Sequence, residues 1–138
     1  MTPDMIKWVR AQIDDEERMA RAATQGAWKL WGMDVLADRD GTSNVNTAQM
    51  VAYTRHESGL LTFNAQHIAT WDPARVLAEV EAKRRILDEH GPDELRPWEC
   101  RACAGPHGDD GYHIPCPTVR LVALPYADRD GYRDEWRP

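Results

Sequence analysis

The three cysteines of this chain all lie between residues 100 and 116, and this clustering constrains the fold more than any other feature of the sequence. A secreted domain held by disulfides usually has an even number of cysteines spread along the chain. Clustered cysteines in a cytosolic protein more often bind a metal. We therefore expect a bound metal, rather than disulfides, to stabilise the C-terminal third.

The spacing of the potential ligands indicates which metal this is. Cys100 and Cys103 are separated by two residues, and His113 and Cys116 repeat that spacing after an intervening loop. Three thiolates and one imidazole form a common tetrahedral shell for structural zinc. We predict a Zn²⁺ site with the ligands Cys100, Cys103, His113 and Cys116. Four protein ligands leave the ion no open position, so the site is predicted to be structural.

Alternatives to this site remain open. His107 or His90 can replace His113 as the fourth ligand. Cys100 and Cys103 can also form a redox pair, although no adjacent strand–helix pattern supports a thioredoxin-like site. The three cysteines can also be free thiols.

Composition and charge narrow the class of protein. The chain has 138 residues, of which 42% are hydrophobic, which is typical of one soluble globular domain. Its net charge of −6 does not favour attraction to nucleic acid or to an anionic membrane. No apolar run is long enough to span a bilayer, and the N-terminus lacks the apolar stretch of a signal peptide. We expect a cytoplasmic protein.

Helical periodicity predicts a long N-terminal helix and a kinked central helix. Apolar residues recur every three or four positions over residues 3–22, with a proline at the first position. Asn64 can cap a helix over residues 65–70. Pro73 interrupts that helix and begins a longer one, which ends at Gly91.

Between these helices the pattern changes to short segments with alternating or β-branched residues. The segments Ala27–Met33, Gln49–Thr54 and Leu60–Phe63 are separated by turn-rich sequence. They predict a small antiparallel sheet with Trp28 and Trp31 near its core.

The complete chain is therefore predicted to be one α+β domain, residues 1–138. An α+β core over residues 1–92 is joined to a zinc-stabilised segment over residues 93–138. Within that segment, residues 118–124 are expected to form a helix, although a strand fits them almost as well. The residues expected to attach the segment to the core are Trp98, Val119, Val122, Tyr126, Tyr132 and Trp136.

Motifs of several enzyme classes are missing from the sequence. It has no zinc-deaminase signature, no phosphate-binding glycine loop, no HExxH and no GxSxG. The loop that begins at Asp38 lacks the closing glutamate of a calcium site. His67 can act as a base or contact a ligand, but a core or capping role is the favoured interpretation.

Three stretches carry a family resemblance: AATQGAWKLW, NAQHIATWDPARVLAEVEAKRRILDEH, and the cysteine cluster leading into CPTVRLVALPYADRDGYRDEWRP. They resemble an uncharacterised family of small proteins from actinobacteria and their phages, known as a domain of unknown function. The resemblance implies no activity. It does imply a phage or mobile-element setting, in which small acidic proteins often bind a host protein.

The favoured function is therefore a non-enzymatic, zinc-stabilised protein-interaction module that binds an unknown host protein. Tyr132 and Trp136 are candidate contacts if they are exposed, although core packing is the favoured role for both. A membrane partner is not expected, and the oligomeric state is open.

Two other functions compete with this one. The first is a nucleic-acid-binding zinc knuckle that uses Arg96, Arg101 and Arg120, although the local charge balance is slightly negative. The second is a small enzyme with a site near His67, which predicts a concave pocket around that residue.

Overall fold

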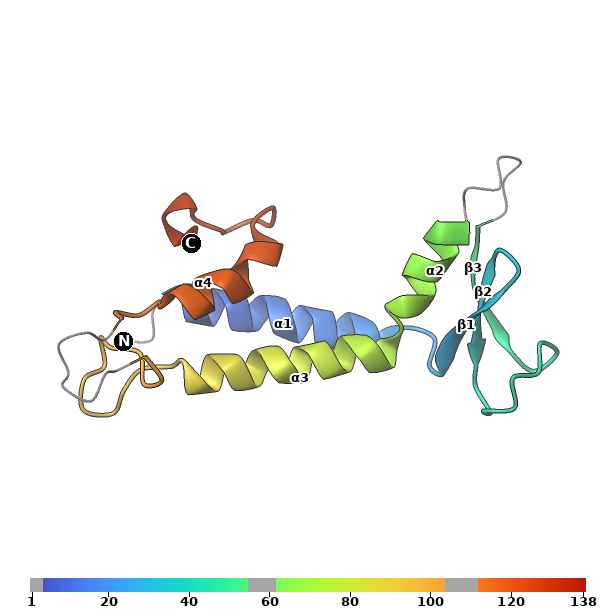
Figure 1. The fold of residues 1–138 in the computed structure, drawn as a ribbon, viewed down its shortest axis with the longest axis horizontal. Coiled ribbons are helices and arrows are strands. Elements are labelled where there is room, and N and C mark those ends of the chain that lie inside the picture. Colours follow the sequence, from blue (N-terminus) through green and yellow to red (C-terminus); the bar gives the residue numbers. More distant parts are fainter. Residues whose placement is uncertain (1–3, 55–61, 104–111) are drawn as a thin grey trace. The chain divides into compact units, whose positions relative to one another are not determined.

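The computed structural model in Figure 1 describes residues 4–54, 62–103 and 112–138. Four helices and a three-stranded antiparallel sheet are found in this part of the chain, which confirms the predicted α+β class. In chain order the elements are α1 (Asp4–Ala22), β1 (Ala27–Trp31), β2 (Asp34–Asp38), β3 (Gln49–Tyr53), α2 (Thr62–Thr70), α3 (Pro73–Glu89), α4 (Pro117–Ala123) and the short 3₁₀ helices Leu124–Tyr126 and Asp134–Trp136.

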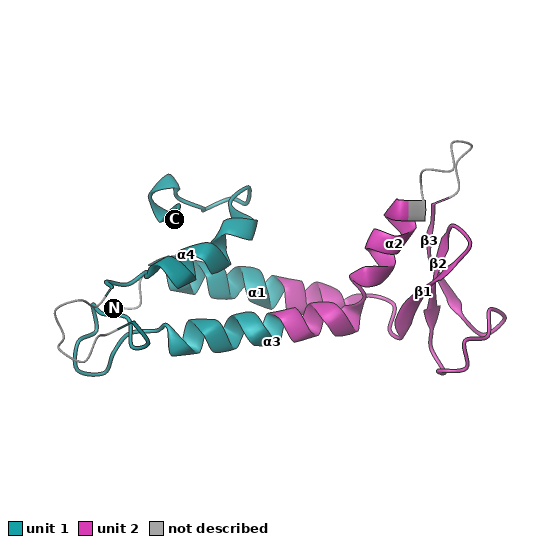
Figure 2. Ribbon diagram, in the orientation of Figure 1, with its two compact units in different colours: residues 1–15, 80–138 teal, residues 16–79 magenta. Residues whose placement is uncertain are grey.

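The chain divides into two compact units, which Figure 2 shows in different colours. The helical unit contains residues 1–15 and 80–138, and the sheet unit contains residues 16–79. The boundaries of these units fall within α1 and α3 and do not coincide with residue 92. The single-domain organisation, with segments 1–92 and 93–138, stays a prediction.

Burial of apolar side chains stabilises the helical unit. The first turns of α1 contribute Val9 and Ile13, α3 contributes Leu87 and α4 contributes Val119, all fully buried. Burial of each such side chain contributes roughly 1.5–3 kcal/mol. Arg10 also forms an ion pair with Asp88 of α3 at 2.7 Å. Exposed ion pairs of this kind contribute at most about 1 kcal/mol, so apolar burial dominates the stability of this unit.

The C-terminal tail packs on α1 through an aromatic cluster. The ring centroids of Trp8, Tyr132 and Trp136 lie 5.5–5.7 Å from one another. The indole N–H of Trp8 donates a hydrogen bond to the carbonyl of Asp130 at 3.1 Å. Trp136 is buried and Tyr132 is half-buried. Both residues therefore take part in core packing, which was the favoured interpretation.

Trp98 differs from the other residues expected to attach the C-terminal segment. Its side chain is 58% exposed, so the prediction that it attaches this segment to the core is wrong. Val119 and Tyr126 are buried as expected, and Val122 is half-buried. The helix expected over residues 118–124 is confirmed by α4, which has Pro117 in its first turn.

The sheet unit is built on a β-hairpin. In this hairpin Ala27 of β1 pairs with Asp38 of β2 at one end, and Trp31 pairs with Asp34 at the other. Gly32 adopts a φ of 64° in the tight turn between the two strands. β2 is the central strand of the order β1-β2-β3, and all five of its residues are buried. α2 packs against β1 and β2. This arrangement confirms the predicted small antiparallel sheet.

The strands differ in detail from the prediction. β1 and β3 match the segments expected at Ala27–Met33 and Gln49–Thr54, but β2 was not predicted. Trp28 and Trp31 are half-buried. The strand expected at Leu60–Phe63 is wrong at its C-terminal end, where Phe63 lies in α2, and residues 60 and 61 lie outside the described residues.

The break between α2 and α3 occurs where the sequence predicts it. The backbone N–H of Arg75 donates to the Asp72 carboxylate at 2.9 Å, so Asp72 caps the helix that Pro73 begins. Asn64 does not cap α2, because that helix already begins at Thr62. α3 continues to Glu89 and places His90 directly after its last turn. No described helix is long and apolar enough to cross a membrane.

Candidate metal centre

The chain reverses direction after α3, and this reversal brings Cys100 back to the end of that helix. The chain turns at Gly91, whose carbonyl accepts a hydrogen bond from the N–H of Arg101 at 2.9 Å. Pro92 and Cys100 form an isolated antiparallel bridge. As a result, the side chain of Cys100 lies beside His90, the residue that follows α3.

The other two cysteines approach the same point from different directions. A tight turn, in which the N–H of Cys103 donates to the carbonyl of Cys100 at 3.2 Å, places the Cys103 thiol beside that of Cys100. A second isolated bridge, between Glu99 and His113, positions the segment that leads to Cys116. Cys116 is the N-cap residue of α4. The site therefore joins α3, the cysteine turn and α4.

The four side chains converge on one point. The Nδ1 atom of His90 lies 3.4 Å from the Sγ of Cys100, 3.6 Å from that of Cys103 and 3.5 Å from that of Cys116. All four potential ligand atoms lie within 4.8 Å of one another. A neutral imidazole nitrogen accepts one proton, so a hydrogen bond explains a close approach to one thiol but not to three.

These separations fit a tetrahedral metal ion. Zinc binds sulfur at about 2.3 Å and imidazole nitrogen at about 2.0 Å, so a tetrahedral centre separates the nitrogen from each sulfur by about 3.5 Å. The distances from His90 to the three cysteines match this value. The residues present therefore fit a metal bound through three sulfurs and the Nδ1 atom of His90.

The site's electrostatics also favour a bound cation. Cys100 and Cys116 are fully buried. Burial, together with the neighbouring thiols of Cys100 and Cys116, raises the pKa of Cys103 to about 12 when no metal is bound. Thiolates in this position therefore need a positive charge between them, which a divalent ion supplies.

The structure places His90, not His113, with the three cysteines. His113 is exposed, and its backbone forms the bridge with Glu99. His107 lies outside the described residues. The matched two-residue spacing favoured His113, but here that spacing serves to pair two backbone segments. His90 precedes the Gly91-Pro92 turn, and this turn was a signal that the chain reverses next to the histidine.

The other candidate residues do not join this cluster. His67 is exposed in the last turn of α2, with its ring centroid 6.3 Å from that of Trp71, so the core role expected for it is wrong. In the loop considered for calcium, the carboxylate of Asp38 accepts hydrogen bonds from Lys29 at 2.8 Å and from the Ser43 N–H at 3.1 Å. Asp38 therefore stabilises this loop through contacts within the protein.

The three arginines considered for nucleic-acid binding all make contacts within the protein. Arg96 pairs with the buried carboxylate of Glu99 at 2.9 Å. Arg101 donates to the carbonyl of Pro92, and Arg120 donates to that of Glu135 at 2.7 Å. Each guanidinium therefore stabilises the fold of the C-terminal segment.

One protein-family model matches nearly all of the given sequence. The model of a family of unknown function, DUF6221, matches residues 2–138. The chain belongs to this family. No curated protein and no solved structure matches it. The matched range contains His90 and the three cysteines, so the candidate metal centre is part of the DUF6221 domain, and the expected resemblance to a domain of unknown function is confirmed.

Proposed function

We propose that this chain is a non-enzymatic protein-interaction module that is stabilised by one structural Zn²⁺ ion. The ligands of this ion are Cys100, Cys103, Cys116 and the Nδ1 atom of His90. The single observation that carries the zinc assignment is the near-equal distance from His90 to the three sulfurs, 3.4–3.6 Å.

Zinc supplies stability that the ligand-bearing segment does not obtain from apolar burial. Leu95 is 88% exposed and Trp98 is 58% exposed, so two of the segment's large apolar side chains contribute little to a core. A structural zinc ion contributes about 10 kcal/mol or more of folding free energy. The ion therefore replaces a hydrophobic core where the end of α3, the cysteine turn and α4 meet.

The four ligands indicate that the proposed zinc ion has a structural and not a catalytic role. Three thiolates and one imidazole complete the tetrahedral shell of zinc, so no position is left for water or substrate. The fold then acts by presenting surfaces rather than by activating a bound molecule.

Two features support a protein partner. The metal-bearing segment exposes Leu95, Trp98 and Tyr112, and large apolar side chains of this kind dominate binding energy at protein interfaces. The net charge of −6 disfavours nucleic acid. The resemblance to proteins of actinobacteria and their phages supports a host protein as the partner, and we propose that the two proteins meet in the cytoplasm.

Elemental analysis tests the zinc assignment. Protein purified without chelator is expected to contain one zinc per chain, and a Cys103→Ser variant is expected to lose both the zinc and thermal stability. A native protein without metal would overturn the assignment, and thiol titration would then identify free or redox-active cysteines.

Direct binding tests the interaction role. Host proteins that the zinc-loaded chain captures are purified, and the affinity of each one for the chain is measured by calorimetry. The same titration with a Trp98→Ser variant of equal zinc content shows whether the metal-bearing segment takes part. Absence of saturable binding to every purified candidate would contradict the interaction role while leaving the zinc assignment unaffected.

A further inference from the structure

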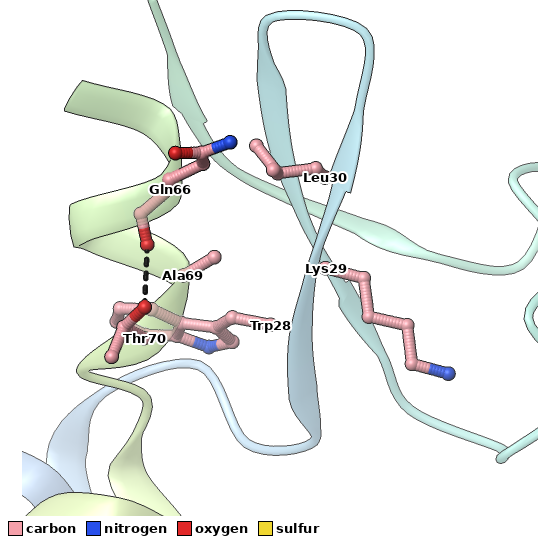
Figure 3. A pocket seen from close by; sticks show the side chains of 6 residues that line it. All are labelled: Trp28, Lys29, Leu30, Gln66, Ala69 and Thr70. Carbon is pink, nitrogen blue, oxygen red and sulfur yellow. Dashed lines mark hydrogen bonds between the residues drawn. The ribbon is translucent and has the colours of Figure 1, made fainter. Parts of the chain in front are cut away.

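A groove runs between α2 and β1 in the sheet unit, and Figure 3 shows the side chains that line it. Its volume is about 480 Å³. The lining residues are Trp28, Lys29 and Leu30 of β1 and Gln66, Ala69 and Thr70 of α2.

One wall of the groove is β1, an edge strand of the sheet. β1 pairs only with β2 among the described strands. The hairpin closes at the Trp31–Asp34 pair, so hydrogen-bonded and non-hydrogen-bonded positions alternate from there along β1. Lys29 is a hydrogen-bonded position. The backbone N–H and C=O groups of Trp28 and Leu30 therefore point away from β2.

Successive side chains of a strand point to opposite faces of the sheet, so those of Trp28 and Leu30 share one face and that of Lys29 lies on the other. Figure 3 shows the side chains of Trp28 and Leu30 directed toward α2 and that of Lys29 directed away from it.

The opposite wall is one flank of α2. Gln66, Ala69 and Thr70 are three and four residues apart, so they lie on the same side of the helix. The hydroxyl of Thr70 donates to the carbonyl of Gln66 at 2.7 Å, as the dashed line in Figure 3 shows. The small side chain of Ala69 leaves space in the middle of this wall.

We propose that this groove binds an extended segment of a partner polypeptide, which pairs with the free edge of β1 as an additional strand. The outward N–H and C=O groups of Trp28 and Leu30 are complementary to the backbone of an extended peptide, and strand addition beside a helix is an established mode of recognition. The inference rests on the proposed role as a protein-interaction module and specifies where that module binds its partner.

The side chains define the chemistry of this partner segment. Residues that pair with Trp28 and Leu30 have their side chains on the face covered by α2, so apolar residues fit there. The residue between them lies beside Lys29, the one charged residue among the lining residues. The ammonium group of Lys29 binds Asp38 at 2.8 Å, and its side chain is still 43% exposed. Charge complementarity therefore favours a hydrophobic–acidic–hydrophobic segment.

NMR titration of the ¹⁵N-labelled, zinc-loaded full chain tests this site. The probe is a capped peptide of sequence Thr-Val-Glu-Val-Thr. Saturable shifts are expected at residues 27–31 and 66–70. N-methylation of both valine amides, which face β1, is expected to weaken binding at least about tenfold, whereas N-methylation of the glutamate amide, which faces away, leaves it nearly unchanged. Equal effects of the two modifications would overturn strand pairing.

Substitutions in β1 also test whether the peptide pairs with this strand. Leu30→Pro removes an N–H that points away from β2, so it deletes a donor in the groove and none in the β1–β2 ladder. It is expected to abolish peptide binding, while the matched control Leu30→Val retains it. Lys29→Glu is expected to reverse the preference, so that Thr-Val-Lys-Val-Thr binds better than the glutamate peptide. If Leu30→Pro disrupts β2, the N-methylated peptides still decide the question.

Other outcomes separate this inference from the proposed function. Shifts confined to residues around Trp98 and Tyr112 would overturn the groove as the binding site but leave the interaction module standing. No shift at millimolar peptide, with one zinc per chain in the same sample, would overturn the groove alone. Concentration-dependent shifts at residues 27–31 without peptide would assign the strand edge to a second copy of this chain instead.

Discussion

The Nδ1 atom of His90 lies 3.4 Å from the Sγ atom of Cys100, although the two residues are ten positions apart in the chain. His90 follows the last turn of α3, and Cys100 lies on the returning segment that pairs with Pro92. Cys116 brings the start of α4 to the same point. Three separate pieces of backbone therefore depend on one small cluster for their position.

Substitution of the two candidate histidines distinguishes the ligand from its neighbour. His90→Ala is expected to lose zinc and to lower the melting temperature markedly, because it removes one of the four ligands and the ion's contribution to folding is lost with the ion. His113→Ala, the matched control, is expected to keep one zinc per chain because its side chain is exposed. Elemental analysis and thermal denaturation measure both effects. Zinc retained in His90→Ala and lost in His113→Ala would reverse the assignment.

Metal binding is expected to release protons. The raised pKa of Cys103, about 12, keeps this thiol protonated at neutral pH without metal, whereas the bound form is a thiolate. Zinc affinity is therefore expected to increase with pH, and binding is expected to release the proton of Cys103. Calorimetric titration in buffers with different ionisation enthalpies measures the number of protons. Release of no protons would contradict thiolate coordination.

The loop after β2 is expected to lose stability in acid. A hydrogen bond from Lys29 lowers the pKa of Asp38, and hydrogen bonds from Thr42 lower the pKa of Asp40 to about 2. Both carboxyls have a lower pKa in the folded protein than in the unfolded chain. Their contribution to stability is therefore complete above about pH 4 and is lost as the pH falls toward 2.

Local hydrogen exchange of the sheet unit measures this acid effect separately from zinc release. An Asp40→Asn variant is expected to show a smaller change in protection between pH 5 and pH 2. An unchanged pH profile in that variant would exclude Asp40 as the cause.

Gly131 is expected to tolerate no side chain. Its φ is +89°, and a Cβ atom there would lie 2.7 Å from the Nε1 atom of Trp8. Gly131→Ala is expected to destabilise the protein by about 2–4 kcal/mol, through backbone strain together with displacement of the aromatic cluster. Gly41→Ala is the control, because Gly41 also has a positive φ but a Cβ there meets nothing within 4 Å. Urea denaturation followed by tryptophan fluorescence compares them, and equal losses would show that contact with Trp8 is unimportant.

Nucleic acid is expected not to bind. The net charge is −6, and Arg96, Arg101 and Arg120 make contacts within the protein. Mobility-shift assays with DNA and RNA at low salt are expected to show no complex. A complex that weakens steeply with added salt would instead support the zinc-knuckle alternative.

Local signals in the sequence predict several elements correctly. Pro73 cannot continue a helix from the preceding residue, so the break between α2 and α3 follows from covalent geometry. Pro117 likewise marks the start of α4. The clustering of the three cysteines also predicts that their thiols lie together, since short turns place closely spaced residues in contact.

Features that depend on distant contacts were harder to predict. β2 contains Val35, Leu36 and Ala37 between two aspartates, and only its central position in the sheet buries all five residues. The approach of His90 to the cysteines depends on a reversal of the chain after α3, which pairs Pro92 with Cys100. Spacing alone favoured His113, because it does not reveal which backbone segments pair.

The packing of Trp8 against Trp136 has a consequence for synthesis of the protein. A ribosome releases Trp8 long before Trp136, and the first turns of α1 meanwhile lack the tail that covers them. The sheet unit consists of one continuous stretch, so all its residues are available while translation continues. The helical unit is made of residues 1–15 and 80–138, so it folds only after the second of these segments has left the ribosome. Until then the nascent chain exposes the apolar face of α1 to chaperones.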